Sequence, residues 1–161
     1  EKLAQVRIEF IAGRKELTDI MKAYIKEIEP IGYAKATNAN YKTLFHKTAK
    51  ALREYFELPK NANLREYFDE NCLKFIEDVE RTVACQLRPE DYGININEFI
   101  QIVVECAELV VKRYERKGNK PKPNRISEQQ RKERKKIIET QKKQNQINQP
   151  NNNLLQHLKL L

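Results

Sequence analysis

The chain has 161 residues, of which 34% are charged, four are glycine and none is tryptophan. This composition is typical of an α-rich protein with room for one domain and an appendage. No apolar run reaches about eighteen residues and no signal-peptide pattern is present, so we expect no transmembrane helix and a cytoplasmic location. Because the sequence starts at Glu1 rather than Met, we expect it to be a piece of a longer chain.

The net charge of +8 is divided unevenly along the chain. Residues 1–111 hold 16 Lys/Arg against 19 Asp/Glu, whereas residues 112–143 hold 14 Lys/Arg against 4 Glu. This division predicts a slightly acidic helical bundle over residues 1–118 and a basic, low-complexity, partly disordered tail over residues 119–161. The tail ends in LLQHLKLL, which is too short to span a bilayer and is suited to docking on the bundle or on a partner.

The first third of the chain predicts a long helix followed by a short one. Apolar residues recur at helical spacing over residues 2–29, and Pro30 is expected to end this helix. Residues 33–37 are expected to form a loop. A short helix follows, with Thr37 or Asn38 as its cap and with Tyr41, Leu44 and Phe45 on its apolar side.

Capping residues mark the later helix starts. Four side chains precede helical patterns and can accept a hydrogen bond from the first turn: Thr48, Asn63, Asp69 and Asn95. They predict a helix that stops at Leu58–Pro59, a single turn, a long helix before Pro89, and a central apolar helix that ends at Gly118. The expected fold class is therefore an all-α bundle of about five or six helices.

The chain shows no signature of a catalytic or metal site. It lacks a glycine-rich phosphate loop, an HExxH motif and a nucleophile elbow, so we expect no enzymatic activity and no cofactor. Cys72, Cys85 and Cys106 lie singly in apolar helical patterns, which predicts buried, reduced thiols and no metal site. Glu80 lies on the flank of an apolar stripe, where an ion pair with a Lys or Arg of another helix is favoured over a functional carboxylate.

Two basic groups are the candidates for nucleic-acid binding. The first lies in a predicted helix of the tail and comprises Arg131, Lys132, Arg134, Lys135 and Lys136. Such a cluster attracts phosphate by charge and counterion release, without sequence preference; the alternative is a solvated, disordered charged segment. The second comprises Lys42, His46, Lys47, Lys50 and Arg53. These residues lie on a different side of their helices from Leu44, Phe45 and Leu52, so we expect them to be exposed.

Three segments together resemble a helical region of phage and prophage antirepressor-type proteins that carry KilA-N or Bro-like domains. They are FIAGRKELTDIMKAYIKE, YKTLFHKTAKALREYFELPKNANLREYF and LKFIEDVERTVACQL, and they span about half of the chain. The resemblance implies a regulatory protein of a mobile genetic element, associated with DNA binding or with oligomerisation beside a DNA-binding domain. The chain departs from the pattern at His46, where a small residue is expected, and it lacks a KilA-N-like strand-and-helix segment.

A second, shorter segment is similar to another family. VRIEFIAGRKEL, over residues 6–17, resembles a helix of the small helical subunit of type III CRISPR effector complexes, which implies that Arg14 and Lys15 contact a guide–target backbone. Taken together, the sequence predicts a non-enzymatic, nucleic-acid-associated protein active in transcription regulation, with no membrane partner. The alternatives are a protein–protein interaction module, a homo-oligomer, or the RNA-backbone-binding subunit.

Overall fold

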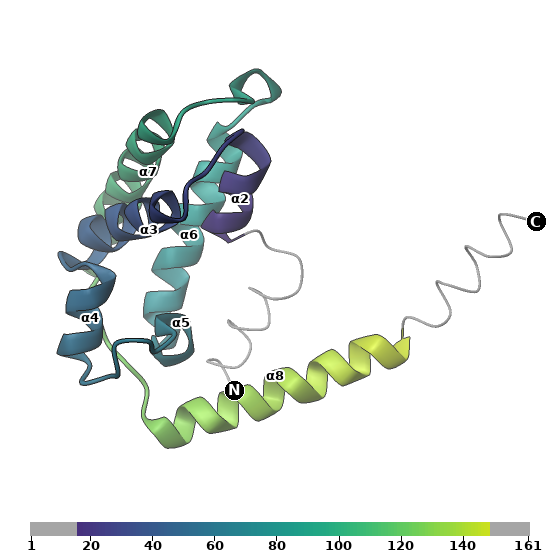
Figure 1. The fold of residues 1–161 in the computed structure, drawn as a ribbon. Helices are drawn as coiled ribbons and strands as arrows, with labels where there is room; N and C mark the ends of the chain where they lie inside the picture. Colours follow the sequence, from purple (N-terminus) through teal and green to yellow (C-terminus); the bar gives the residue numbers. More distant parts are fainter. Residues whose placement is uncertain (1–15, 149–161) are drawn as a thin grey trace, which may run out of the picture.

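The computed structural model describes residues 16–148, which form seven α-helices and one 3-10 turn (Figure 1). The helices are α2 (Leu17–Tyr24), α3 (Pro30–Phe45), α4 (Ala49–Tyr55), α5 (Leu64–Tyr67), α6 (Glu70–Gln86), α7 (Ile96–Arg116) and α8 (Glu128–Asn148), with η1 (Pro89–Asp91) between α6 and α7. The predicted all-α bundle is confirmed. Six of these helices lie before residue 118, in agreement with the expected number.

The start of the bundle differs from the prediction. α2 ends at Tyr24, and Pro30 begins the next helix instead of ending the previous one. Proline is well suited to a first helical position, because the N–H that it lacks would have no partner within the helix. The prediction of one helix up to residue 29 is therefore wrong for its described part. The predicted loop at residues 33–37 is also wrong, since these residues lie inside α3; residues 1–15 lie outside the described part.

Four of the predicted caps are present, whereas the cap expected at Thr37 or Asn38 is wrong because both residues lie inside α3. The side chains of Thr48, Asn63, Asp69 and Asn95 accept hydrogen bonds from the N–H groups of Ala51, Arg65, Cys72 and Glu98. After the last turn of α7, Gly118 adopts a φ of +73°, a left-handed conformation that costs glycine little. Local capping chemistry thus sets the starts of α4, α5, α6 and α7, and also the end of α7.

The core of the bundle lies among α3, α6 and α7. α7 packs along both α3 and α6 and contributes the fully buried side chains of Phe99, Val103 and Val110. A Cβ on Gly32 would lie 3.5 Å from Ile96, so the first turns of α3 and α7 lie against each other. The same Cβ would lie only 3.2 Å from the Ile28 side chain, so it is this contact that favours glycine here.

An aromatic cluster holds α4 and α5 on α3. The ring of Phe68 is completely buried and lies 5.6 Å from the rings of Tyr41 and Phe45 and 5.8 Å from that of Phe56. Its edge-to-face contacts with Tyr41 and Phe56 are of the kind that add stability beyond the buried area. The short helices are therefore fixed by side chains that flank them rather than by their own length.

The predicted linker after α7 packs on the bundle. Ile126 is 4% exposed, and its N–H donates to the carbonyl of Tyr67 at 2.7 Å. The guanidinium of Arg125 donates to the carbonyl of Phe56 at 2.7 Å. From there α8 starts beside α5 and then projects away from the bundle (Figure 1). The tail thus begins with a docked segment and a helix that includes residues 144–148 of the predicted low-complexity stretch, whereas LLQHLKLL lies outside the described residues.

The three thiols are free but differ in exposure. Cys72 and Cys106 are buried as predicted, and burial raises the pKa of Cys106 to about 11. Cys85 is exposed near the end of α6, so the prediction that it would be buried is wrong. The helical spacing that places Val83 in the core turns Cys85 outward, because two positions correspond to about 200° of rotation.

Candidate nucleic-acid interface

The second basic group, which comprises Lys42, His46, Lys47, Lys50 and Arg53, lies around the turn between α3 and α4. This turn consists of residues 46–48 and is held by local hydrogen bonds: Asn38 Oδ1 accepts from the N–H of Ala49 at 2.9 Å, and Thr48 caps α4. His46 takes a φ of +59° at the C-terminal cap of α3, a conformation more usual for glycine. The turn therefore holds its side chains at fixed positions.

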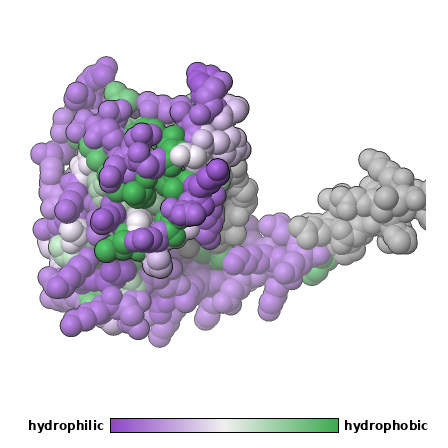
Figure 2. All heavy atoms as spheres, turned by 45° about the horizontal axis from the view of Figure 1, so that its top comes forward, coloured by the Kyte–Doolittle hydropathy of each residue, from purple (hydrophilic) through white to green (hydrophobic). Residues whose placement is uncertain are grey.

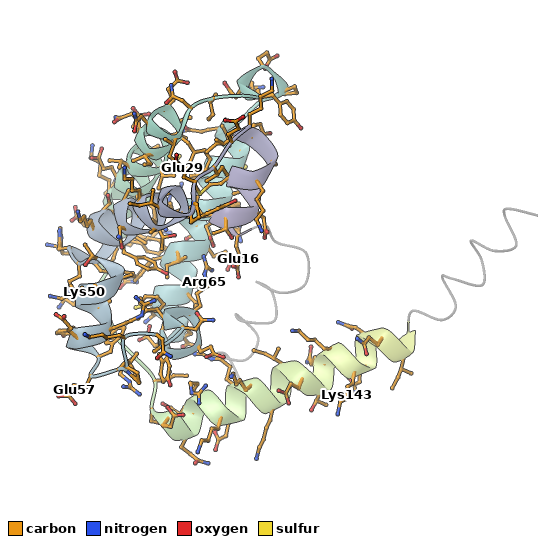
Figure 3. All side chains as sticks on the ribbon, in the orientation of Figure 1. Glu16, Glu29, Lys50, Glu57, Arg65 and Lys143 are labelled. Carbon is orange, nitrogen blue, oxygen red and sulfur yellow. The ribbon has the colours of Figure 1, made fainter. Side chains whose placement is uncertain are left out.

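Only part of this group is exposed as predicted. Lys42, His46 and Lys50 are exposed, and Lys50 projects from α4 (Figure 3). Lys47 is half-buried with its Nζ 4.9 Å from the ring centroid of Tyr55, and half-buried Arg53 donates its Nε–H to the carbonyl of Ala62 at 2.8 Å. The expectation of exposure is wrong for Lys47 and Arg53, because an aromatic ring and a backbone carbonyl engage their cationic heads.

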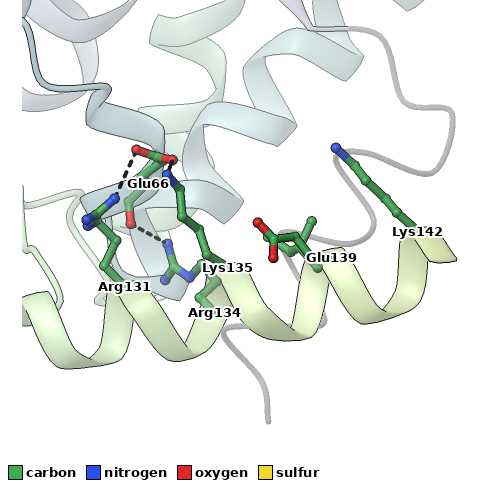
Figure 4. Close-up of a pocket in the computed structure, with 7 residues that line it drawn as sticks. Glu66, Arg131, Arg134, Lys135, Glu139 and Lys142 are labelled. Atoms are coloured by element: carbon green, nitrogen blue, oxygen red, sulfur yellow. Dashed lines mark hydrogen bonds and ion pairs between the residues drawn. The ribbon is translucent and has the colours of Figure 1, made fainter.

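The first basic group, at residues 131–136, divides between two faces of α8. Lys132 and Lys136 are exposed, and neither side chain forms an ion pair with another described residue. Arg131, Arg134 and Lys135 instead point towards α5 (Figure 4). The division arises because α8 lies against α5 along one face.

Glu66 of α5 is the common partner of the inward residues. Its carboxylate oxygens lie 3.5 Å from Nη1 of Arg131 and 2.8 Å from Nζ of Lys135. Its backbone carbonyl accepts a hydrogen bond from Arg134 at 3.2 Å, and Arg134 is 4% exposed (Figure 4). One residue of the bundle thus contacts three basic side chains of α8.

A second contact fixes the start of α8. The Tyr67 hydroxyl donates to the carboxylate of Glu128 at 3.0 Å, and Arg131 donates its Nε–H to the same carboxylate at 2.9 Å. The guanidinium of Arg131 also lies 5.1 Å from the ring centroid of Tyr67. These hydrogen bonds, the one from Arg131 foremost, lower the pKa of Glu128. The first turn of α8 is held by both charge and aromatic contact.

The sequence-based choice of candidates missed the most exposed basic segment. Between residues 112 and 122, six cationic side chains are exposed and Glu115 is the one acid: Lys112, Arg113, Arg116, Lys117, Lys120 and Lys122. This segment, called the basic strip below, covers the last turn of α7 and the docked connection to α8. The change in charge balance at residue 112 could have indicated this segment. The prediction instead chose residues 131–136, RKERKK, because positive charge is denser there.

Glu80 forms a buried ion pair, as predicted. It is 2% exposed on α6, and its carboxylate accepts hydrogen bonds from the guanidinium of Arg65. The same carboxylate accepts from the N–H of Leu17 at 2.7 Å and so satisfies the first turn of α2. Burial raises the pKa of Glu80, while Arg65 and the Leu17 N–H oppose that shift. With both groups serving to hold α2 and α5 on α6, the arrangement is structural.

The described residues offer no metal site and no membrane span. Within residues 16–148, no three His, Cys, Asp or Glu side chains are grouped so that they could hold a metal ion. None of the helices in that range is both long and apolar enough to cross a bilayer.

Comparison of the chain with protein-family models, curated proteins and solved structures finds no match. The resemblances to phage antirepressor-type proteins and to the CRISPR subunit therefore stay predictions. Any functional argument depends on the geometry and charge of the described residues.

Proposed function

We propose that this protein is a non-enzymatic nucleic-acid-binding protein that contacts the phosphate backbone chiefly through the basic strip. The observation that carries the proposal is the set of six exposed cations with a single acid over residues 112–122. Exposed Lys and Arg at this density attract the phosphate backbone and release its counterions. A regulatory role in a mobile genetic element is the biological setting that the phage resemblance suggests.

Two further features of α8 support contact with the phosphate backbone of a nucleic acid. Lys132, Lys136 and Lys143 of α8 are exposed and lie within about 40° of one another around the helix axis, so they form a second row of charge. α8 itself is a largely hydrophilic projection (Figure 2). Neither feature provides the base-edge contacts that sequence selection needs, so we propose binding without strong sequence preference.

A salt titration of duplex binding tests this proposal. Fluorescence anisotropy with a labelled duplex of arbitrary sequence is expected to show binding at low salt. Each phosphate contact is expected to add about 0.9 to the slope of log K against log salt. The triple variant Arg113→Glu, Arg116→Glu, Lys120→Glu is expected to abolish most of the binding.

The matched control reverses three exposed lysines at the other end of α7: Lys22→Glu, Lys26→Glu and Lys35→Glu. Lys22 and Lys26 lie beside Gly93, which precedes α7 and is about 30 Å from the end of that helix. The control is expected to weaken binding far less than the strip variant. An equal loss in both variants would mean that net charge alone governs binding, and no binding at low salt would refute the proposal.

A protein-interaction role is the second candidate. Figure 2 shows apolar side chains gathered on one face of the bundle, with hydrophilic ones around them. At the start of α3, Ile28 and Ile96 meet beside Gly32, and the neighbouring Ile31 is 59% exposed. Exposed apolar surface of this kind marks contact sites in other proteins. Sedimentation of wild type and Ile31→Glu tests for self-association: a monomer at all concentrations would refute a homo-oligomer that uses this surface.

A further inference from the structure

The contact between α5 and α8, called the seam below, is formed by Glu66 of α5 and by Arg131, Arg134 and Lys135 of α8. Positive charge is therefore concentrated around the single carboxylate of Glu66. A cavity of about 160 Å³ is lined by Glu66 together with Arg131, Arg134, Lys135 and Lys142 of α8, and by Glu139 at its edge. The four basic residues occur at intervals of three, one and seven positions, so they lie along one face of the helix. Figure 4 shows Lys142 on the same side of α8 as the residues that contact Glu66.

Glu66 has the position that a phosphate group would take against these side chains. Its two carboxylate oxygens each contact a different cation, Arg131 at 3.5 Å and Lys135 at 2.8 Å. Arg and Lys contact phosphate oxygens through the same charge-assisted geometry. The basic face of α8 is thus already arranged to bind an anionic oxygen pair.

We propose that the inward face of α8 is a second binding surface for the nucleic-acid phosphate backbone, and that Glu66 occupies it in the free protein. This inference rests on the proposed nucleic-acid binding and deepens it. When a backbone phosphate displaces Glu66, Arg131 and Lys135 contact nucleic acid, and the first two turns of α8 separate from α5. The outward lysines, about 100° around the helix, then contact the same backbone from the other side.

The contacts that hold the seam are suited to exchange. The side chains of Lys135, Glu66 and Arg131 are 50%, 22% and 18% exposed, so water and salt reach these ion pairs. Pairs of this kind are weak individually and are screened by salt. A duplex offers many phosphates near the basic strip, which raises their local concentration beside α8.

The test compares two substitutions that change net charge equally. Glu66→Gln removes the internal competitor, whereas Glu133→Gln removes an exposed carboxylate of α8 that accepts a hydrogen bond only from Gln129 among the described residues. Glu66→Gln is expected to bind duplex about two- to fivefold more tightly than wild type, as expected when half-exposed ion pairs cease to compete. Binding by Glu133→Gln is expected to change by less than half of that factor.

A second measurement uses the wild-type seam and does not depend on a substitution at Glu66. Labels at Cys85, which is exposed, and at Ile147→Cys, where the native residue is 71% exposed, report the distance between α6 and the far end of α8. Cys72 and Cys106 are buried and are expected to stay unlabelled. Addition of duplex is expected to lengthen and broaden this distance.

The possible outcomes separate the inference from the function on which it rests. If wild type binds duplex but Glu66→Gln and Glu133→Gln bind equally, the inference is overturned and the proposed function stands. An unchanged label distance at saturating duplex overturns the inference in the same way. If wild type shows no binding at low salt, the proposed function fails and this inference fails with it.

Discussion

The short helix α5 places two neighbouring charged residues in opposite surroundings. Arg65 turns into the bundle, where it pairs with Glu80, a residue that is 2% exposed (Figure 3). Glu66 turns towards α8, where its partner Lys135 has a side chain that is 50% exposed. Both arrangements are carboxylate–cation pairs that involve the same four-residue helix, but the side chain of Glu80 is 3% exposed and that of Glu66 is 22% exposed.

This difference assigns the two pairs different roles. A buried pair that loses one member leaves an uncompensated charge without water, so its integrity is a condition for the fold. A half-exposed pair that loses one member leaves a charge that water solvates at once. The Arg65–Glu80 pair therefore holds α2, α5 and α6 together permanently, whereas the Glu66 contacts hold α8 in an exchangeable way.

The largest expected effect is that of Glu80→Gln. The substitution removes the buried carboxylate that pairs with Arg65 and leaves that guanidinium with the more exposed carboxylate of Glu16 at 3.8 Å. It is expected to lower the free energy of unfolding by about 3 kcal/mol, the low end of the range for breaking a buried pair. Urea denaturation followed by far-UV circular dichroism measures the change. The control Glu105→Gln alters an exposed carboxylate of α7 and is expected to change stability by less than about 0.5 kcal/mol. A loss below that of an exposed pair would refute the structural role of Glu80.

A smaller effect is expected when the exposed partner is changed. Glu66→Gln is expected to lower the free energy of unfolding by roughly 0.2–1 kcal/mol, the value of an exposed ion pair. At 1 M salt, where the Debye length is about 3 Å, this loss is expected to disappear while that of Glu80→Gln persists. Denaturation at two salt concentrations thus sharpens the comparison. A loss at Glu66 that is large and independent of salt would show that the seam is part of the permanent fold.

Sequence reasoning succeeded where the deciding interactions are local. The caps at Thr48, Asp69 and Asn95 follow from side chains that bond to N–H groups three positions further along. It failed at Pro30, because proline can either end a helix or begin one, and local rules allow both. It also failed at residues 33–37, where tertiary packing decides: Ala36 is completely buried within α3 and Asn40 is 2% exposed.

The candidate site could be predicted only in part, for the same reason. Charge composition marked residues 112–143 as basic, and that holds for the basic strip. Which face of α8 is covered depends on Glu66, which lies 65 positions before Arg131 in the sequence. The residue pattern of α8 does not indicate which face meets Glu66, because the inward and outward faces carry the same residue types. The ion pair of Glu80 was predictable as a type, but its partner Arg65 was not.

The smallest expected effect concerns pH at the start of α8. The hydrogen bonds from Arg131 and Tyr67 lower the pKa of Glu128 below its ordinary value of about 4.3. A carboxyl with a lowered pKa in the docked state favours docking above its ordinary pKa, and this contribution is lost as the pH falls through the lowered value. The distance between labels at Cys85 and Ile147→Cys is therefore expected to lengthen on acidification below about pH 4. Glu128→Gln is expected to flatten this response, and Glu133→Gln to leave it unchanged. If Glu128→Gln and Glu133→Gln respond identically to acid, the charge of Glu128 does not hold the first turn of α8. That turn would then be held by the Tyr67 ring and by backbone contacts, and the only exchangeable ion pairs between α5 and α8 among the described residues would be those of Glu66.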